Sequence, residues 1–200
     1  MTAINEGTTL TIEDGIAVVT LDFPPVNAMS PALMDGLYDA LMAALADDAA
    51  KAIVLICAGR TFIAGADLKS LGKVQPKVDF FALQDSIENS PKPTVAALHG
   101  TALGGGMETA LTFHYRIAVP SARMGLPEVT LGLLPGGGGT QRLPRITGAE
   151  AALDLLISGR QVGAKEALGI GLIDRLATEG QLREDAIAFA PEVAAAGNSP

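Results

Sequence analysis

The chain has 200 residues, of which 48% are hydrophobic and 18% are charged. This is enough apolar material for a core, and it argues against a disordered chain. The net charge of −8, from 14 basic and 22 acidic residues, argues against nucleic acid or an anionic membrane surface as a partner.

The cysteine usage and the N-terminal sequence both bear on location. The only cysteine, Cys57, lies in the apolar run 52–57, so we expect it in the core, and one cysteine allows no intrachain disulfide. Residues 1–6 lack the basic start and apolar stretch of a signal peptide. No apolar run approaches the ~20 residues that a bilayer span needs. A cytoplasmic protein is therefore expected.

The first third of the chain predicts a strand, a helix and a second strand. Residues 16–23 are rich in β-branched side chains and lie between Gly15 and Pro24, which is typical of a strand. Ser30 and Pro31 then form a helix start, and leucines at every fourth residue predict a buried helical stripe as far as Asp47. A fully apolar strand is expected at 53–58.

The rest of the chain continues in the same manner. The pattern predicts helices at 80–89, 107–112, 149–158, 164–168 and 181–190, strands at 94–98 and 116–119, and a glycine-rich loop at 135–139. A second short helix ending near Gly197 is also expected. Apolar strands separated by helices favour an α/β fold with mainly parallel strands. The order is strand–strand–helix as often as strand–helix–strand, so a doubly wound Rossmann sheet is not favoured.

Several kinds of chemistry have no motif in this chain. His99 and His114 are not spaced for a metal site, so no metal is expected and both are interpreted as structural histidines. There is no Gly-x-Ser-x-Gly elbow of an esterase. The glycine run 104–106 does not fit a dinucleotide fingerprint, and no Walker lysine follows any glycine loop.

Two loops of very small residues, 62–67 and 103–108, stand out as candidate binding elements. In the second loop the glycines open a helix, so their N–H groups lack intrahelical acceptors and the helix dipole adds positive potential. This arrangement suits a developing negative charge. Residue types alone leave open that both loops are only tight turns.

Two carboxylates accompany these loops. Glu108 follows the second loop directly, which could reflect only the preference for an acid in a first helical turn. Glu128 has apolar neighbours in 125–130, where partial burial would raise its pKa and suit proton transfer. An exposed loop acid is the alternative. Spacing cannot show whether the two side chains meet.

Several segments, in order along the chain, resemble the enoyl-CoA hydratase/isomerase (crotonase) family from about Gly15 to about Arg175. They are Pro25–Ser30, Phe62–Lys69, Lys92–Gly100, Ala102–Glu108, Gly125–Pro135, Gly139–Pro144 and Ala164–Asp174. The resemblance implies a spiral of strand–strand–helix turns, followed by a helical region that takes part in trimer contacts. Residues 113–118 and 127–135 look most similar to the hydratase part of multifunctional fatty-acid oxidation proteins.

The resemblance also implies roles for particular residues. The oxyanion-hole N–H groups of the family match Ala66 and Gly105, and its two catalytic glutamates match Glu108 and Glu128. Further contacts with substrate or CoA are implied at Ala64, Asp67, Leu68, Lys69 and Gly136. Coenzyme A would be part of the substrate, so no separate cofactor is expected.

The function that the resemblance implies is hydration of the C2=C3 bond of a trans-2-enoyl-CoA. The alternatives are 3,2-trans-enoyl-CoA isomerisation, or a non-catalytic acyl-CoA-binding or scaffold role. We expect a spiral core at 1–176, the start of an apparently truncated C-terminal helical region at 177–200, and a homo-oligomer, either a trimer or a hexamer.

Overall fold

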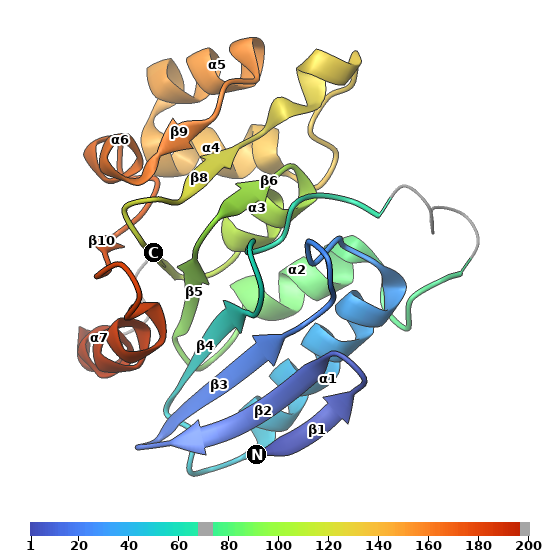
Figure 1. Cartoon of the computed structure of the whole chain (residues 1–200), viewed down its shortest axis with the longest axis vertical. Coiled ribbons are helices and arrows are strands. Elements are labelled where there is room, and N and C mark those ends of the chain that lie inside the picture. Colours follow the sequence, from blue (N-terminus) through green and yellow to red (C-terminus); the bar gives the residue numbers. More distant parts are fainter. Residues whose placement is uncertain (68–73, 197–200) are drawn as a thin grey trace.

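One mixed sheet forms the centre of the protein, as a computed structural model that describes residues 1–67 and 74–196 shows (Figure 1). In this part of the chain its strand order is β1-β2-β3-β4-β5-β7-β10. The strands are β1 Thr2–Asn5, β2 Thr8–Glu13, β3 Ile16–Leu21, β4 Ala52–Cys57, β5 Thr94–Leu98, β7 Tyr115–Ala118 and β10 Arg175–Leu176.

The sheet is antiparallel at one edge and parallel elsewhere. β1, β2 and β3 pair in antiparallel fashion, whereas β3, β4, β5, β7 and β10 pair in parallel. In the parallel part Val18 lies opposite Val54, and Leu55 lies opposite Ala96. These side chains are buried, as expected for strands covered on both faces, so the predicted α/β fold with mainly parallel strands is confirmed.

A small second sheet consists of β6 (Thr101–Leu103), β8 (Arg123–Gly125) and β9 (Val162–Gly163). β6 follows β5 after two residues and leads directly into helix α3 (Gly105–Ala110). The predicted strand–strand–helix order is therefore present as β5–β6–α3, and α3 begins two residues earlier than expected.

Helices lie on both faces of the large sheet and beside the small sheet (Figure 1). They are α1 Pro31–Ala46, α2 Phe80–Glu88, α4 Gly139–Thr147, α5 Ala149–Ser158, α6 Ala164–Gly169 and α7 Leu182–Ala196, with a 3-10 helix η1 at Pro127–Leu131. The Ser30 side chain caps α1 by accepting the N–H of Leu33, as the sequence predicts. Among the described residues, no helix is both long and apolar enough to span a membrane.

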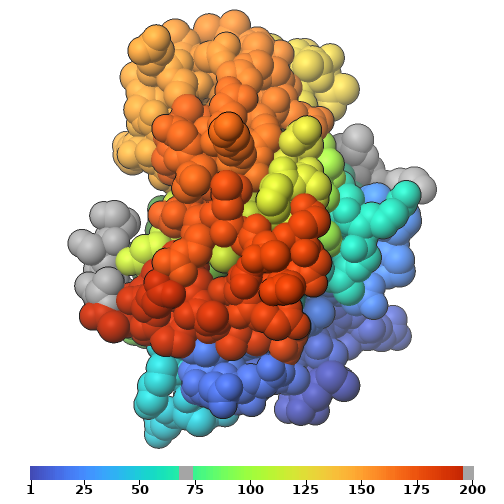
Figure 2. Space-filling view, turned by 60° about the vertical axis from the view of Figure 1, so that its left-hand side comes forward, coloured from blue at the N-terminus to red at the C-terminus, as the bar shows by residue number. Residues whose placement is uncertain are grey.

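Helix α7 packs against β3, β4, β5 and β7, on the face opposite α1. Figure 2 shows this C-terminal segment directly over the N-terminal strands, where Arg183 forms an ion pair with Glu13. The ring of Phe189 meets Tyr115 edge-on, with 6.0 Å between centroids. The predicted second short helix is wrong, because α7 continues past Pro191 to Ala196. The division of the chain at residue 176 remains a prediction.

The sequence did not predict the hairpin β1–β2, the short strands β6, β8 and β9, or η1. β1 is exposed or half-buried, so it lacks an apolar signal. Strands of two or three residues are too short to show the alternation that identifies a half-buried strand. Their positions depend on pairing with distant segments.

A buried asparagine connects the loops that follow β3 and β4. Asn27 Nδ2 donates to the carbonyl oxygens of Ala58 and Thr61, both at 2.9 Å, and its Oδ1 accepts the N–H of Phe23 at 2.7 Å. Its positive φ of 50° is a conformation that asparagine tolerates better than most residues. These hydrogen bonds hold residues 26–29 against residues 58–66 and so fix one half of the site described below.

Candidate functional site

The loop after β4 and the first turn of α3 together present two backbone N–H groups. Met29 pairs with the segment around Ala66, because the Met29 N–H donates to Gly65 O at 2.8 Å and Met29 O accepts from Asp67 at 3.2 Å. The N–H of Ala66, between these two bonds, has no acceptor in the described part of the chain. Gly105 is the first residue of α3, so its N–H has no intrahelical acceptor either.

These two N–H groups lie close together. A Cβ placed on Gly105 would lie 4.0 Å from the Ala66 nitrogen. Ala66 is exposed and Gly105 is half-exposed, so a ligand can reach both. The pair has the form of an oxyanion hole, in which one oxygen atom accepts two N–H groups. The structure thus brings together the two residues that the sequence predicted for this role.

Glu108 is the better anchored of the two carboxylates. It is buried in α3, and its Oε1 accepts the N–H groups of Gly137 at 2.6 Å and Gly139 at 2.9 Å. A Cβ on Gly137 would come within 2.6 Å of Glu108 Oε2 and within 2.3 Å of the Phe80 ring. A side chain at position 137 would therefore displace the carboxylate or the ring.

Glu128 lies on η1 in a half-buried position. Burial raises the pKa of its carboxyl; a hydrogen bond from its own backbone N–H opposes this shift, and the charge of Glu108 adds to it. Its Oε2 is buried and has no hydrogen-bond partner among the residues that the structure describes. Gly104, which has a positive φ of 51°, lies close to the Glu128 carboxylate, since a Cβ at this position would be 3.1 Å from Glu128 Oε1. Glu128 thus lies next to the glycine that precedes Gly105.

The remaining predicted contacts surround these groups. Ala64 and Asp67 flank the exposed N–H of Ala66, and Gly136 is exposed next to Gly137. Leu68 and Lys69 lie outside the described residues. The substrate-binding roles of all five stay predictions.

The sequence did not predict three groups that organise this site. It identified the loop 135–139 by its glycines, but could not assign the N–H groups of Gly137 and Gly139 to Glu108. It also passed over Gln84, a fully buried side chain in α2 that donates to backbone carbonyls of the site. The sequence does contain a signal for Gln84, namely a polar residue next to Leu83 on the apolar face of the helix.

The histidines and the cysteine take no part in this site. His114 accepts the N–H of Thr94 at Nδ1 and contacts Glu88 O through Nε2, so its predicted structural role is confirmed. His99 Nε2 contacts Gly59 O at 3.2 Å. Cys57 is buried as predicted, and burial raises the pKa of its thiol, which opposes a nucleophilic role. Across 1–67 and 74–196, no cluster of three or more His, Cys, Asp or Glu could hold a metal ion.

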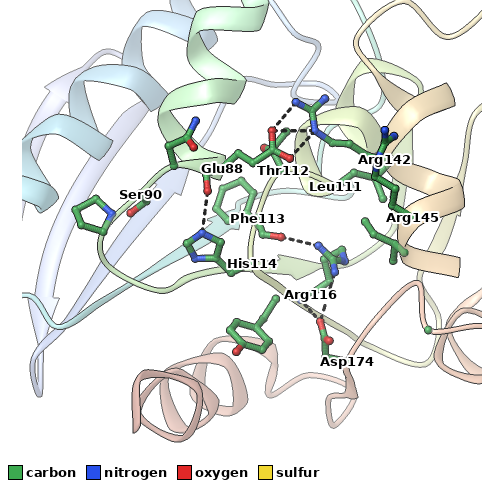
Figure 3. Close-up of a pocket in the computed structure, with 15 residues that line it drawn as sticks. Glu88, Ser90, Leu111, Thr112, Phe113, His114, Arg116, Arg142, Arg145 and Asp174 are labelled. Atoms are coloured by element: carbon green, nitrogen blue, oxygen red, sulfur yellow. Dashed lines mark hydrogen bonds and ion pairs between the residues drawn. The ribbon is translucent and has the colours of Figure 1, made fainter. Parts of the chain in front are cut away.

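A separate pocket of about 890 Å³ lies at the other end of α3 (Figure 3). Arg142 forms an ion pair with Glu88 at 2.8 Å across its upper wall. The buried Arg116 donates to Phe113 O at 2.6 Å and lies 3.8 Å from Asp174. These charged groups are already paired within the protein, so the pocket does not compete with the carboxylate site as a candidate reaction centre.

Comparisons with known proteins agree on one family. A family model described as enoyl-CoA hydratase/isomerase matches residues 11–199. The peroxisomal bifunctional enzyme of Danio rerio is 46% identical over 179 residues, which cover 90% of this chain and 25% of that protein. A probable enoyl-CoA hydratase of Bacillus subtilis (strain 168) is 42% identical over 171 residues, or 82% of this chain and 66% of that one.

Comparison of the fold with solved structures indicates the same family. The solved enoyl-CoA hydratase from Bacillus anthracis matches with a TM-score of 0.86 and 34% identity, over 94% of this chain and 77% of that chain. The predicted spiral fold is therefore confirmed. The chain spans about a quarter of the length of the bifunctional enzymes that it matches.

The raised pKa of Glu128 predicts a pH-dependent difference in stability between the native chain and Glu128→Gln. A carboxyl whose pKa is raised on folding stabilises the folded state below its unfolded pKa of about 4.3, and this contribution is lost as the pH rises through the folded pKa. Glutamine stays neutral, so the variant should become progressively more stable than the native chain as the pH rises. Urea unfolding from pH 4 to pH 8 measures this. A difference that does not change with pH would contradict the proposed burial effect.

Proposed function

Because the chain belongs to the enoyl-CoA hydratase/isomerase family, we propose that it adds water across the C2=C3 bond of a trans-2-enoyl-CoA, to give a 3-hydroxyacyl-CoA in fatty-acid oxidation. One observation carries the proposal: two carboxylates, Glu108 and Glu128, lie beside the N–H groups of Ala66 and Gly105, which have no acceptor among the described residues. Acid/base groups and an anion-binding pair are the two components that this reaction needs.

In the proposed reaction, the thioester carbonyl oxygen accepts the N–H groups of Ala66 and Gly105. Negative charge grows on this oxygen as water attacks C3, so the two fixed donors stabilise the transition state more than the ground state. Both donors are held by the fold, Ala66 by the pairing with Met29 and Gly105 by the start of α3. Little reorganisation is then needed as the charge develops.

The two carboxylates divide the proton transfers. Glu108 accepts a proton from the attacking water while the water oxygen bonds to C3, and Glu128 delivers a proton to C2. The firm anchoring of Glu108 Oε1 by two N–H groups leaves Oε2 to orient the water. The raised pKa of Glu128 supports its role as the proton donor. Exchange of protons with solvent restores both groups.

Isomerisation of a 3-enoyl-CoA is the nearest alternative, since Glu128 alone could move a proton between C2 and C4. The anchored Glu108 favours hydration, because the isomerisation does not need a second carboxylate. A non-catalytic binding role would not require the buried Glu108, nor a Glu128 whose Oε2 has no partner among the described residues.

Replacing either carboxylate by its amide should remove most hydration activity. We expect Glu108→Gln and Glu128→Gln each to lower kcat for crotonyl-CoA at least ~100-fold, as is typical for loss of a general acid or base. Loss of the enoyl thioester absorbance measures the rate, and circular dichroism checks folding. Isomerase activity should suffer more from Glu128→Gln. Near-native hydration in either variant would contradict the assigned role.

Two substitutions at Gly105 distinguish the effect of losing the N–H donor from the effect of filling the space around it. Proline is well tolerated at the first position of a helix, so Gly105→Pro should fold while losing the donor. We expect a kcat loss of about 100- to 1000-fold. Gly105→Ala keeps the donor and meets no atom closer than 3.9 Å, but its methyl group would face Ala66 N, where the substrate oxygen binds. It should therefore fold normally and be less severely impaired. A folded, fully active Gly105→Pro enzyme would remove Gly105 from the hole.

We also propose that the chain self-associates, as a trimer or hexamer. Support comes from exposed leucines on two neighbouring elements, η1 with the loop after it, and α5. Leu131 is 70% exposed and Leu134 is 81% exposed, while Leu153 and Ile157, one turn apart on α5, are 59% and 66% exposed. Apolar side chains gathered in this way are common at subunit interfaces.

Sedimentation velocity tests this assembly. The native chain should sediment as a trimer or a multiple of it, and the double variant Leu153→Ser/Ile157→Ser should shift toward the monomer because its apolar face is interrupted. Leu168→Ser, which changes an exposed leucine on α6, is the matched control and should assemble normally. A monomeric native chain would refute the proposal.

The location in the cell also stays a proposal. The cytoplasm is expected from the sequence, whereas the names of several relatives place those proteins in peroxisomes.

A further inference from the structure

Gln84, on α2, is a buried polar side chain that the proposed mechanism does not use. It is 0% exposed, and its Nε2 donates to Gly137 O at 2.8 Å and to Glu108 O at 3.3 Å. Both acceptors are carbonyl oxygens, which cannot donate, so the NH₂ end of the amide must face them. Gln84 therefore contacts the backbone of Glu108 and of the residue that holds the Glu108 carboxylate.

Gly137 connects Gln84 to this carboxylate. The N–H of Gly137 donates to Glu108 Oε1 at 2.6 Å, while its carbonyl oxygen accepts from Gln84. The same carbonyl oxygen also accepts from Arg142 Nη1 at 3.1 Å, and Arg142 is held by Glu88, one turn beyond Gln84 on α2. Helix α2 thus fixes Gly137 twice, directly and through an ion pair.

Stability alone does not account for a glutamine at this position. Gln84 Oε1 is buried and has no hydrogen-bond partner in the described part of the chain. Burying an amide with an unpaired oxygen costs free energy, which the two donated hydrogen bonds offset only in part, whereas an apolar side chain of similar shape carries no such cost. A buried amide whose hydrogen bonds all go to the backbone of the site points to a role in the reaction.

We propose that Gln84 is a positioning residue for the hydration reaction. Its amide fixes the backbone of Gly137, and the N–H of Gly137 in turn holds Glu108 Oε1, so that Oε2 remains aimed at the attacking water. This inference rests on the proposed function. The role differs from that of Glu108 itself, because the Gln84 side chain is fully buried and donates its hydrogen bonds to the backbone of Glu108 and of Gly137.

Gln84→Met tests the proposal, since methionine has a similar shape and no donor. The free energy of unfolding should change little, because the loss of two donated hydrogen bonds is offset by removal of the unpaired Oε1. By contrast, kcat should fall at least ~10-fold, since small misplacement of a catalytic group is costly. KM should stay within about twofold, because the N–H groups that bind the thioester are untouched. The matched control is Ile87→Val, buried on the same helix, which should be slightly less stable than the native chain and keep its kcat.

A double-mutant cycle separates positioning from a general effect on the enzyme. In the Glu108→Gln background, Gln84→Met should cause little further loss, because the carboxylate through which it acts is already gone. An equal loss in both backgrounds would overturn the proposal, and so would an unchanged kcat in Gln84→Met alone.

Amide hydrogen exchange gives a readout that does not depend on activity. The N–H groups of Gly137 and Gly139 should exchange faster in Gln84→Met than in the native chain or in Ile87→Val. Unchanged exchange would overturn the positioning role. If the native chain fails to hydrate crotonyl-CoA, the proposed function fails, and exchange alone then decides whether Gln84 fixes Gly137.

Discussion

The hydrogen bonds from Gly137 and Gly139 to the buried Glu108 carboxylate are the interaction on which the site depends. A buried carboxylate is costly unless it is hydrogen-bonded, and among the described residues the donors are backbone N–H groups rather than side chains. The chain must therefore bring a loop of glycines against α3, close enough for backbone N–H groups to reach the acid. The start of α4 is therefore held against α3. Gln84, on α2, holds the same glycine loop from the other side of the hydrogen bond, by donating to Gly137 O.

This constraint also explains the contrast between the two carboxylates. Glu108 lies on a helix within the core and receives two backbone donors. Glu128 lies on a short 3-10 helix, and one of its oxygens is buried without a hydrogen-bond partner in the described part of the chain. Partial burial without full compensation raises the pKa of Glu128, which suits a proton donor. One fold thus places two chemically identical side chains in different environments, which is the arrangement that an acid/base pair requires.

The sequence predicted the longer elements well. The stripe of α1, the apolar strands β4 and β5, and α5 all carry a local period or an uninterrupted apolar run, and these depend only on neighbours in the chain. β6, β8 and β9 have no such signal, because two or three residues cannot define a period. Helix α7 shows a different limit. Its packing over the N-terminal strands depends on partners more than 100 residues away, such as Glu13 with Arg183.

For the site, the sequence by itself determined the chemical groups: two glutamates, two loops of small residues, and a glycine run before α4. Through their resemblance to a family, it also implied which of them act together. Only the tertiary structure decided that Gly137 and Gly139 hold Glu108, that Ala66 lies opposite Gly105, and that Gln84 supports the loop. The physical reason is that these contacts are made largely by backbone N–H and C=O groups. Almost every residue carries them, so no residue type marks where they meet.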